Sequence, residues 1–215
     1  MEKSKKWLGI SIGLFVVFIL WTIIVCFVDV RAIGPQSSSV GLAGINQFVH
    51  NLTGVHFTLY QITDWLGLVP IGVCMGFGVL GLIQWIQRKN IWKVDYSILV
   101  LGGFYVITIA IYLFFEKFVI NFRPVLIEGY LEVSYPSSTT MLVMCVMPTA
   151  MMQWSSRIKN KKWKKIVIFI STIFIAFMVI ARLLSGVHWF TDIIGGALVS
   201  AGLVTMYYAV NSLHK

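Results

Sequence analysis

Charged residues are scarce in this chain of 215 residues, where they make up 12% of the total and hydrophobic residues make up 58%. A typical soluble domain contains about 25% charged residues, so the composition excludes an ordinary soluble protein. The apolar stretches also lack the polar face, repeating every 3.6 residues, that a helix of a soluble bundle would show. The composition therefore predicts an integral membrane protein.

Cysteine is also rare. The chain has three, Cys26, Cys74 and Cys145, and each falls within an apolar stretch. An odd number of cysteines in such stretches argues against a disulfide framework, and no spacing typical of metal ligands is present. We therefore expect neither disulfide bridges nor a metal site.

Apolar stretches that approach or exceed the ~20 residues of a transmembrane helix recur along the whole chain. They predict an all-α, polytopic membrane protein in which a single domain, residues 1–215, contains six transmembrane helices. The predicted spans are residues 7–28, 65–86, 96–115, 138–154, 166–184 and 189–210. The first span follows a lysine-rich start and no small-residue cleavage site comes after it, so we interpret it as an uncleaved anchor.

Acidic residues are outnumbered, 8 against 17 basic ones, which gives a net charge of +9. With an even number of spans, most basic residues fall on one side of the membrane together with both termini. They are Lys3, Lys5, Lys6, Arg88, Lys89, Lys93, Arg157, Lys159, Lys161, Lys162, Lys164, Lys165 and Lys215. The positive-inside rule makes this side cytoplasmic, in a plasma membrane. Topology and anionic lipid headgroups account for the charge, so we expect no nucleic-acid partner.

The opposite, extracytoplasmic side carries Asp29–Asp64, the longest polar segment. Its residues 40–52 are amphipathic, which predicts a helix lying on the membrane surface. This side has only four basic residues, Arg31, Lys117, Arg123 and Arg182. Three of these four belong to the motifs described next.

Three short motifs fall at the predicted ends of spans on this side. They are Arg123-Pro124 after Lys117, then Pro136-Ser137-Ser138, and finally Arg182, His188 and Asp192. Together they resemble the signature of the PAP2 (type 2 phosphatidic acid phosphatase) superfamily. The resemblance implies a PAP2-type helical bundle that hydrolyses phosphate esters or anhydrides through a histidine nucleophile, without a metal or an organic cofactor.

His188 and Asp192 are four residues apart, so on a helix they share a face. A carboxylate there can accept a hydrogen bond from one imidazole nitrogen, which leaves the other nitrogen free to attack. The attack would be on phosphorus and would give a phosphohistidine. We therefore predict His188 and Asp192 as the catalytic pair.

Cationic and N–H donors are needed around the phosphoryl group, because its transition state spreads negative charge over three oxygens. Guanidinium groups suit this role, which favours Arg123 and Arg182. Backbone N–H groups at Ser137 and Ser138, where a helix is expected to begin, add a site for an anion. Lys117 completes the predicted phosphate-binding set, although the resemblance places the usual lysine seven residues before the arginine, where this chain has Glu116.

The middle motif departs most from the family pattern, because Thr139 stands where the resemblance implies a histidine that protonates the leaving oxygen. A threonine hydroxyl is a poor acid near neutral pH, and general-acid assistance is worth on the order of 10²–10⁴ in rate. A phosphomonoester must expel an alkoxide, comparable to water with its pKa of ~15.7. A lipid diphosphate expels a phosphate monoester whose second pKa is ~6, so it can leave without a proton. The sequence therefore favours a lipid diphosphate, such as an undecaprenyl-type diphosphate, as substrate.

Two alternatives stay open at this stage. The phosphohistidine could pass its group to a lipid or glycan acceptor, which would make the protein a phosphotransferase. The loss of the histidine at Thr139 could also mark a catalytically impaired binder or transporter of lipid phosphates.

Overall fold

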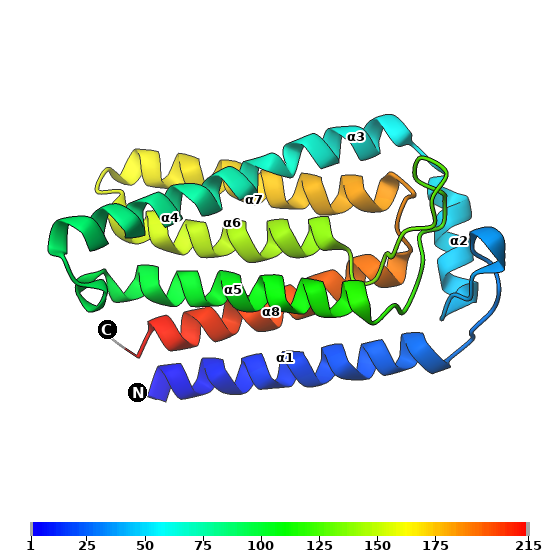
Figure 1. Cartoon of the computed structure of the whole chain (residues 1–215), viewed down its shortest axis with the longest axis horizontal. Helices are drawn as coiled ribbons and strands as arrows, with labels where there is room; N and C mark the ends of the chain where they lie inside the picture. The colour runs from blue at the N-terminus through cyan, green and yellow to red at the C-terminus, as the bar shows by residue number, and fades with distance from the viewer. Residues whose placement is uncertain (1, 214–215) are drawn as a thin grey trace.

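The computed structural model describes residues 2–213, which fold into long helices running side by side (Figure 1). The long helices are α1 (Glu2–Phe27), α4 (Leu68–Arg88), α5 (Tyr96–Lys117), α6 (Ser138–Arg157), α7 (Lys161–Leu184) and α8 (Phe190–Asn211). Shorter helices are α2 (Ala43–Thr53), α3 (Phe57–Leu66), η1 (Pro35–Ser37) and η2 (Ile91–Lys93). Within this part of the chain the only β-structure is a few isolated bridges, which confirms the all-α prediction.

Among the described residues, five stretches of helix are long and apolar enough to cross a membrane. They are Ser4–Phe27, Phe57–Arg88, Tyr96–Lys117, Lys161–Leu184 and Phe190–Asn211. The second contains both α3 and α4, which meet at Gly67. The remaining predicted span, residues 138–154, corresponds to α6, which is long enough but falls outside these five, so the predicted number of six spans is not confirmed.

The position of α6 explains its lower apolarity. This helix contacts α4, α5, α7 and α8, and therefore lies inside the bundle. Buried polar side chains such as Thr149 and Gln153 are tolerated there because each finds a hydrogen-bond partner within the protein. The outer helices instead expose large apolar side chains, as a lipid-facing surface requires.

The two ends of the bundle differ in chemistry. The start of α1, the α4–α5 connection and the α6–α7 connection lie at one end, on the left of Figure 1, and most basic residues belong to them. Lys215, assigned to the same side from the sequence, lies outside the described residues. All three motifs lie at the other end, because they adjoin the C-terminal end of α5, the N-terminal end of α6 and the α7–α8 connection.

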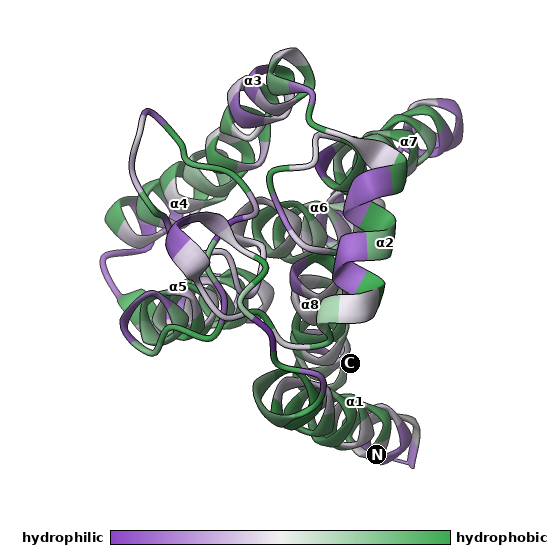
Figure 2. Ribbon diagram, turned by 90° about the vertical axis from the view of Figure 1, so that its right-hand side faces the viewer, coloured by the Kyte–Doolittle hydropathy of each residue, from purple (hydrophilic) through white to green (hydrophobic). Residues whose placement is uncertain are grey.

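Helix α2 lies across the motif-bearing end of the bundle (Figure 2). Its side chains Phe48 and Leu52 are 67% and 77% exposed, whereas Asn46 is fully buried. Asn46 donates to the Thr191 hydroxyl over 3.0 Å and accepts from the Thr191 backbone N–H over 3.1 Å. The amphipathic helix predicted over residues 40–52 is thus present, and its polar face is attached to the first turn of α8.

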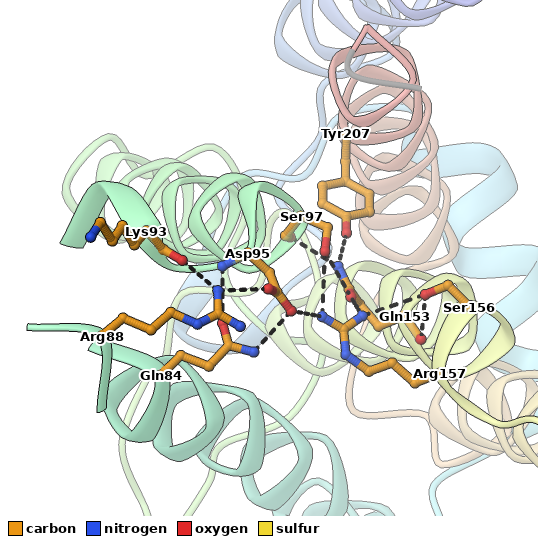
Figure 3. Close-up of polar contacts among 9 residues, drawn as sticks. All are labelled: Gln84, Arg88, Lys93, Asp95, Ser97, Gln153, Ser156, Arg157 and Tyr207. Atoms are coloured by element: carbon orange, nitrogen blue, oxygen red, sulfur yellow. Dashed lines mark hydrogen bonds and ion pairs between the residues drawn. The ribbon is translucent and has the colours of Figure 1, made fainter. Parts of the chain in front are cut away.

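At the opposite end, a polar cluster that we call the Asp95 network joins four of the long helices (Figure 3). The Asp95 carboxylate accepts from Gln84 over 2.8 Å and pairs with Arg88 at 3.0 Å and Arg157 at 3.4 Å. From α6, Gln153 donates to the backbone oxygen of Ser97 and to the hydroxyl of Tyr207. These contacts connect α4, the start of α5, α6 and α8.

Candidate active site

A short hairpin between α5 and α6 carries the first motif. Asn121 and Ser134 are paired through a backbone hydrogen bond of 3.0 Å, and Arg123 donates to the backbone oxygen of Glu132 over 2.9 Å. The turn contains Glu128 and Gly129, both with positive φ, as a tight hairpin turn requires. Arg123 and Glu132 are therefore direct cross-strand neighbours, and their side chains also form an ion pair of 2.9 Å.

The third motif depends on a tight turn between α7 and α8. Gly186 has a φ of +67°, and a Cβ there would lie 1.9 Å from the backbone oxygen of Gly54. The neighbouring Ser185 accepts a 2.9 Å hydrogen bond from the backbone of His56. Only glycine fits this approach, which packs the turn against the α2–α3 connection and places His188 just before α8.

His188 is buried, with 3% of its surface exposed, and its two ring nitrogens face different groups. Nε2 lies 3.2 Å from Nη1 of Arg123, and Nδ1 lies 3.6 Å from Oδ2 of Asp192. A guanidinium group only donates hydrogen bonds, so Nε2 must accept and the ring proton belongs on Nδ1. The Nδ1–Asp192 distance exceeds a hydrogen bond, so the carboxylate lies beside Nδ1 without being hydrogen-bonded to it.

The pKa of His188 is lowered well below its ordinary value, chiefly by burial and further by the positive charges of Arg123 and Arg182. The imidazole is therefore neutral near physiological pH. A neutral ring with a lone pair on Nε2 is the form that a nucleophilic histidine needs.

Asp192 is held by both other motifs. Its Oδ2 accepts from the backbone N–H of Trp189 over 2.9 Å, and its Oδ1 accepts from Asn121 over 3.2 Å. Its backbone oxygen accepts from the N–H of Ser137 over 3.0 Å. The carboxylate caps the first turn of α8 as well as facing His188, so its position is fixed by the helix end.

Arg182 is 1% exposed, and contacts with α3 hold its side chain in position. Its Nη1 donates to the Thr63 hydroxyl over 3.1 Å, and its guanidinium lies 4.7 Å from the centre of the Tyr60 ring. The guanidinium of Arg123 lies 5.9 Å from the same ring. Tyr60 thus brings the two arginines to one place, and cation–π attraction partly compensates their mutual repulsion.

A cavity of about 460 Å³ opens beside these groups. Its wall includes His188, Arg123, Ser138, Tyr112, Glu116 and Glu132. His188, Arg123 and the N-terminal end of α6 therefore meet at one cavity that has room for a phosphate group, whereas Arg182 is not among the residues of its wall.

A second, mostly apolar cleft of about 350 Å³ lies between α4, α5 and α6. Ile71, Thr108, Ile109 and Met141 line it, together with Thr139, and it shares Tyr112 and Ser138 with the first cavity. Thr139 therefore lines the apolar cleft and does not line the cavity that contains His188.

The remaining predicted residues are distributed as follows. Ser137 is fully buried, and its hydroxyl accepts from Thr140 at the start of α6. Lys117 does not line the cavity that contains His188; it lines a separate groove between α1 and α5. Glu116, one residue earlier on the helix, takes the place in the cavity wall instead, because consecutive helical residues point ~100° apart.

Sequence reasoning missed four residues that build the site, namely Asn121, Glu132, Tyr60 and Thr63. Asn121 and Glu132 belong to the hairpin, whose pairing no helical periodicity reveals. Tyr60 and Thr63 come from α3, far from all three motifs in sequence. The available signals were Asn121, two residues before Arg123, and Glu132 in the loop that follows.

Within residues 2–213, no three His, Cys, Asp or Glu side chains gather as they would around a metal ion.

A sequence model described as the PAP2 superfamily matches residues 98–214. Among solved structures, the fold is similar to that of a transmembrane PAP2-type phosphatidylglycerolphosphate phosphatase from Bacillus subtilis. That match has 20% sequence identity, covers 95% of this chain and 96% of that one, and has a TM-score of 0.54. No curated protein sequence matches the chain.

Proposed function

The chain belongs to the PAP2 superfamily of membrane phosphatases, and on this premise we propose that it hydrolyses a lipid diphosphate of the polyprenyl type through a phosphohistidine on His188. The observation that carries this proposal is the position of His188 in the wall of the cavity, with its Nε2 3.2 Å from Nη1 of Arg123. The reaction class follows from the family, and the substrate and the intermediate are our inference.

In the proposed first step, the terminal phosphate enters the cavity between Arg123 and the start of α6. Arg123 neutralises the charge that develops on the phosphoryl oxygens from the cavity wall, and Arg182, which lies at the same Tyr60 ring, adds positive charge from outside the wall. Nε2 of His188 attacks phosphorus, the bond to the bridging oxygen breaks, and a lipid monophosphate leaves. Asp192 stabilises the positive charge that the ring acquires, since its carboxylate lies beside Nδ1.

The leaving group decides the substrate class. No imidazole stands at position 139, and Thr139 lies in the apolar cleft rather than beside Nε2. A monophosphate leaves without a proton because its second pKa is ~6, whereas the alkoxide of a phosphomonoester does not. The lipid chain would occupy the apolar cleft, which adjoins the phosphate cavity at Tyr112 and Ser138.

The orientation in the membrane follows from charge. The basic connections lie at the end of the bundle opposite the cavity, so we place that end in the cytoplasm and the cavity at the outer face of the plasma membrane. The substrate would then be a lipid whose diphosphate faces outward. No metal takes part in the mechanism that we propose.

The experiment that tests this function is phosphate release from a polyprenyl diphosphate by the detergent-purified protein, with and without EDTA. We expect turnover that resists EDTA, that vanadate inhibits, and that His188→Gln abolishes. A protein that binds the lipid equally well before and after His188→Gln, and never releases phosphate, would be a lipid-phosphate binder instead.

A further inference from the structure

We infer that Glu132 is a further catalytic residue, the general base that activates water in the second half of the reaction. The inference rests on the proposed phosphohistidine mechanism. Hydrolysis of a phosphoenzyme needs a group that takes a proton from the attacking water. Thr139 lacks the basicity for this, so the proton acceptor must come from elsewhere in the cavity wall.

Glu132 is positioned for this by the hairpin. Its backbone oxygen accepts from the N–H of Arg123, and its carboxylate pairs with Nε of Arg123 at 2.9 Å. Nη1 of the same guanidinium lies 3.2 Å from Nε2 of His188. The carboxylate and the reactive nitrogen therefore lie at two positions of one rigid, planar group.

Exposure supports the same role. The Glu132 side chain is 42% exposed, while the Arg123 side chain beside it is 9% exposed. Because Glu132 lines the cavity that contains His188, the carboxylate can reach both the guanidinium and water in the cavity. A proton acceptor that is held in place and still hydrated is what the second step requires.

Glu116 is the rival, since it lines the same cavity. It is exposed on the last turn of α5, where its side chain hydrogen-bonds with Tyr112 and does not pair with Arg123. Only Glu132 is attached to the guanidinium that contacts Nε2 of His188, which favours Glu132 as the general base.

The proposed step balances as follows. The oxygen of water bonds to phosphorus as the bond between phosphorus and Nε2 breaks, and the electron pair of that bond returns to Nε2. The water proton passes to the Glu132 carboxylate and then to the departing phosphate or to solvent. His188 is again neutral, and inorganic phosphate is released.

The test compares Glu132→Gln with the unmodified protein on a polyprenyl diphosphate labelled in its terminal phosphate. Glutamine keeps the size and an acceptor for Arg123 but is not a base. We expect release of the lipid monophosphate in the first turnover at the unmodified rate, and steady-state phosphate release slower by about 10²-fold. The label should accumulate on the protein in an acid-labile form, and hydroxylamine, a stronger nucleophile than water, should remove it.

The control is Glu128→Gln, an exposed carboxylate of the hairpin turn outside the cavity wall, which should leave both phases unchanged. Glu116→Gln, which removes the rival carboxylate, is measured alongside it. Equal slowing of the first turnover and the steady state, without labelled protein, would mean that Glu132 only positions Arg123 and would overturn the inference. An unchanged steady state, or the same accumulation in Glu116→Gln, would also overturn it. Failure of the proposed function itself is distinct, because the unmodified protein would then release neither product.

Discussion

At the scale of single residues, the proposed reaction depends on the charge state of His188. Two arginines and nearly complete burial oppose a proton on the ring, and Arg123 donates toward Nε2. The net shift of the His188 pKa is downward even though the Asp192 carboxylate lies 3.6 Å from Nδ1. The nucleophile is therefore prepared before the substrate arrives.

This state is directly measurable. Nitrogen NMR of protein labelled at histidine should show His188 as a neutral ring protonated at Nδ1, and this form should persist at about pH 5.5, where an ordinary histidine with a pKa of ~6.5 is mostly charged. The signal is assigned by its loss in His188→Gln. A His188 that titrates near the ordinary value would contradict the proposed origin of its reactivity.

At the scale of elements, the site depends on how α7 turns into α8. Replacing Gly186 by alanine places a Cβ against the Gly54 backbone oxygen and forces a non-glycine residue into a left-handed conformation. We expect a loss of stability of more than ~2 kcal/mol and reduced phosphate release, measured by thermal unfolding in detergent and by activity.

The matched control is Gly129→Ala in the hairpin turn. Gly129 also has a positive φ, of +85°, but nothing lies within 4 Å of a Cβ there. Gly129→Ala should lower the free energy of unfolding only by the strain of the left-handed backbone conformation, about 1–2 kcal/mol. Equal effects of the two substitutions would mean that the contact between Gly186 and Gly54 does not position the site.

At the opposite end of the bundle, we expect the Asp95 network to hold the helices in place relative to one another. The pKa of Asp95 lies below its usual range, chiefly because Gln84 donates a hydrogen bond to the carboxylate. A hydrogen bond from Arg88 and the positive charges of Arg88 and Arg157 lower this pKa further. A lowered pKa in the folded state stabilises the protein above the unfolded pKa of ~3.9, and this contribution is lost as the pH falls through the folded value.

Asp95→Asn should accordingly lower stability at neutral pH by about 1 kcal/mol and weaken the loss of stability below about pH 4. Thermal unfolding between neutral and acidic pH measures both effects. Asp29→Asn, which alters an exposed pair with Arg31, serves as the control and should change stability less. A variant as stable as the unmodified protein at neutral pH would show that the network does not hold α4, α5 and α6 together.

At the scale of the whole molecule, the phosphate cavity and the apolar cleft adjoin each other at Tyr112 and Ser138, and we propose that the lipid chain binds in the cleft. Ile109→Trp should fill the cleft, because Ile109 lines it. We expect a higher KM for a long-chain diphosphate and little change for a short-chain one, measured in the same detergent. Val106→Trp, on the same helix but outside that wall, is the control; an equal effect there would contradict binding of the chain in the cleft.

Much of this arrangement could be predicted from sequence, and what could not has a physical reason. Long apolar stretches identify spans directly, and His188 and Asp192 lie four residues apart on one chain segment. Lys117 and Glu116 could not be ranked by spacing, because only the orientation of α5 decides which enters the cavity. Tyr60, Thr63 and Glu132 depend on contacts between elements distant in sequence, and such contacts leave no periodic pattern.

The most direct test of the central claim is a comparison of kcat/KM for a polyprenyl diphosphate and for phosphatidate, in the unmodified protein and in Thr139→His. The account predicts that the unmodified protein prefers the diphosphate by about 10²-fold or more, and that the added imidazole raises cleavage of phosphatidate. Cleavage of phosphatidate as fast as the diphosphate by the unmodified protein would contradict the claim that the missing proton donor selects the substrate.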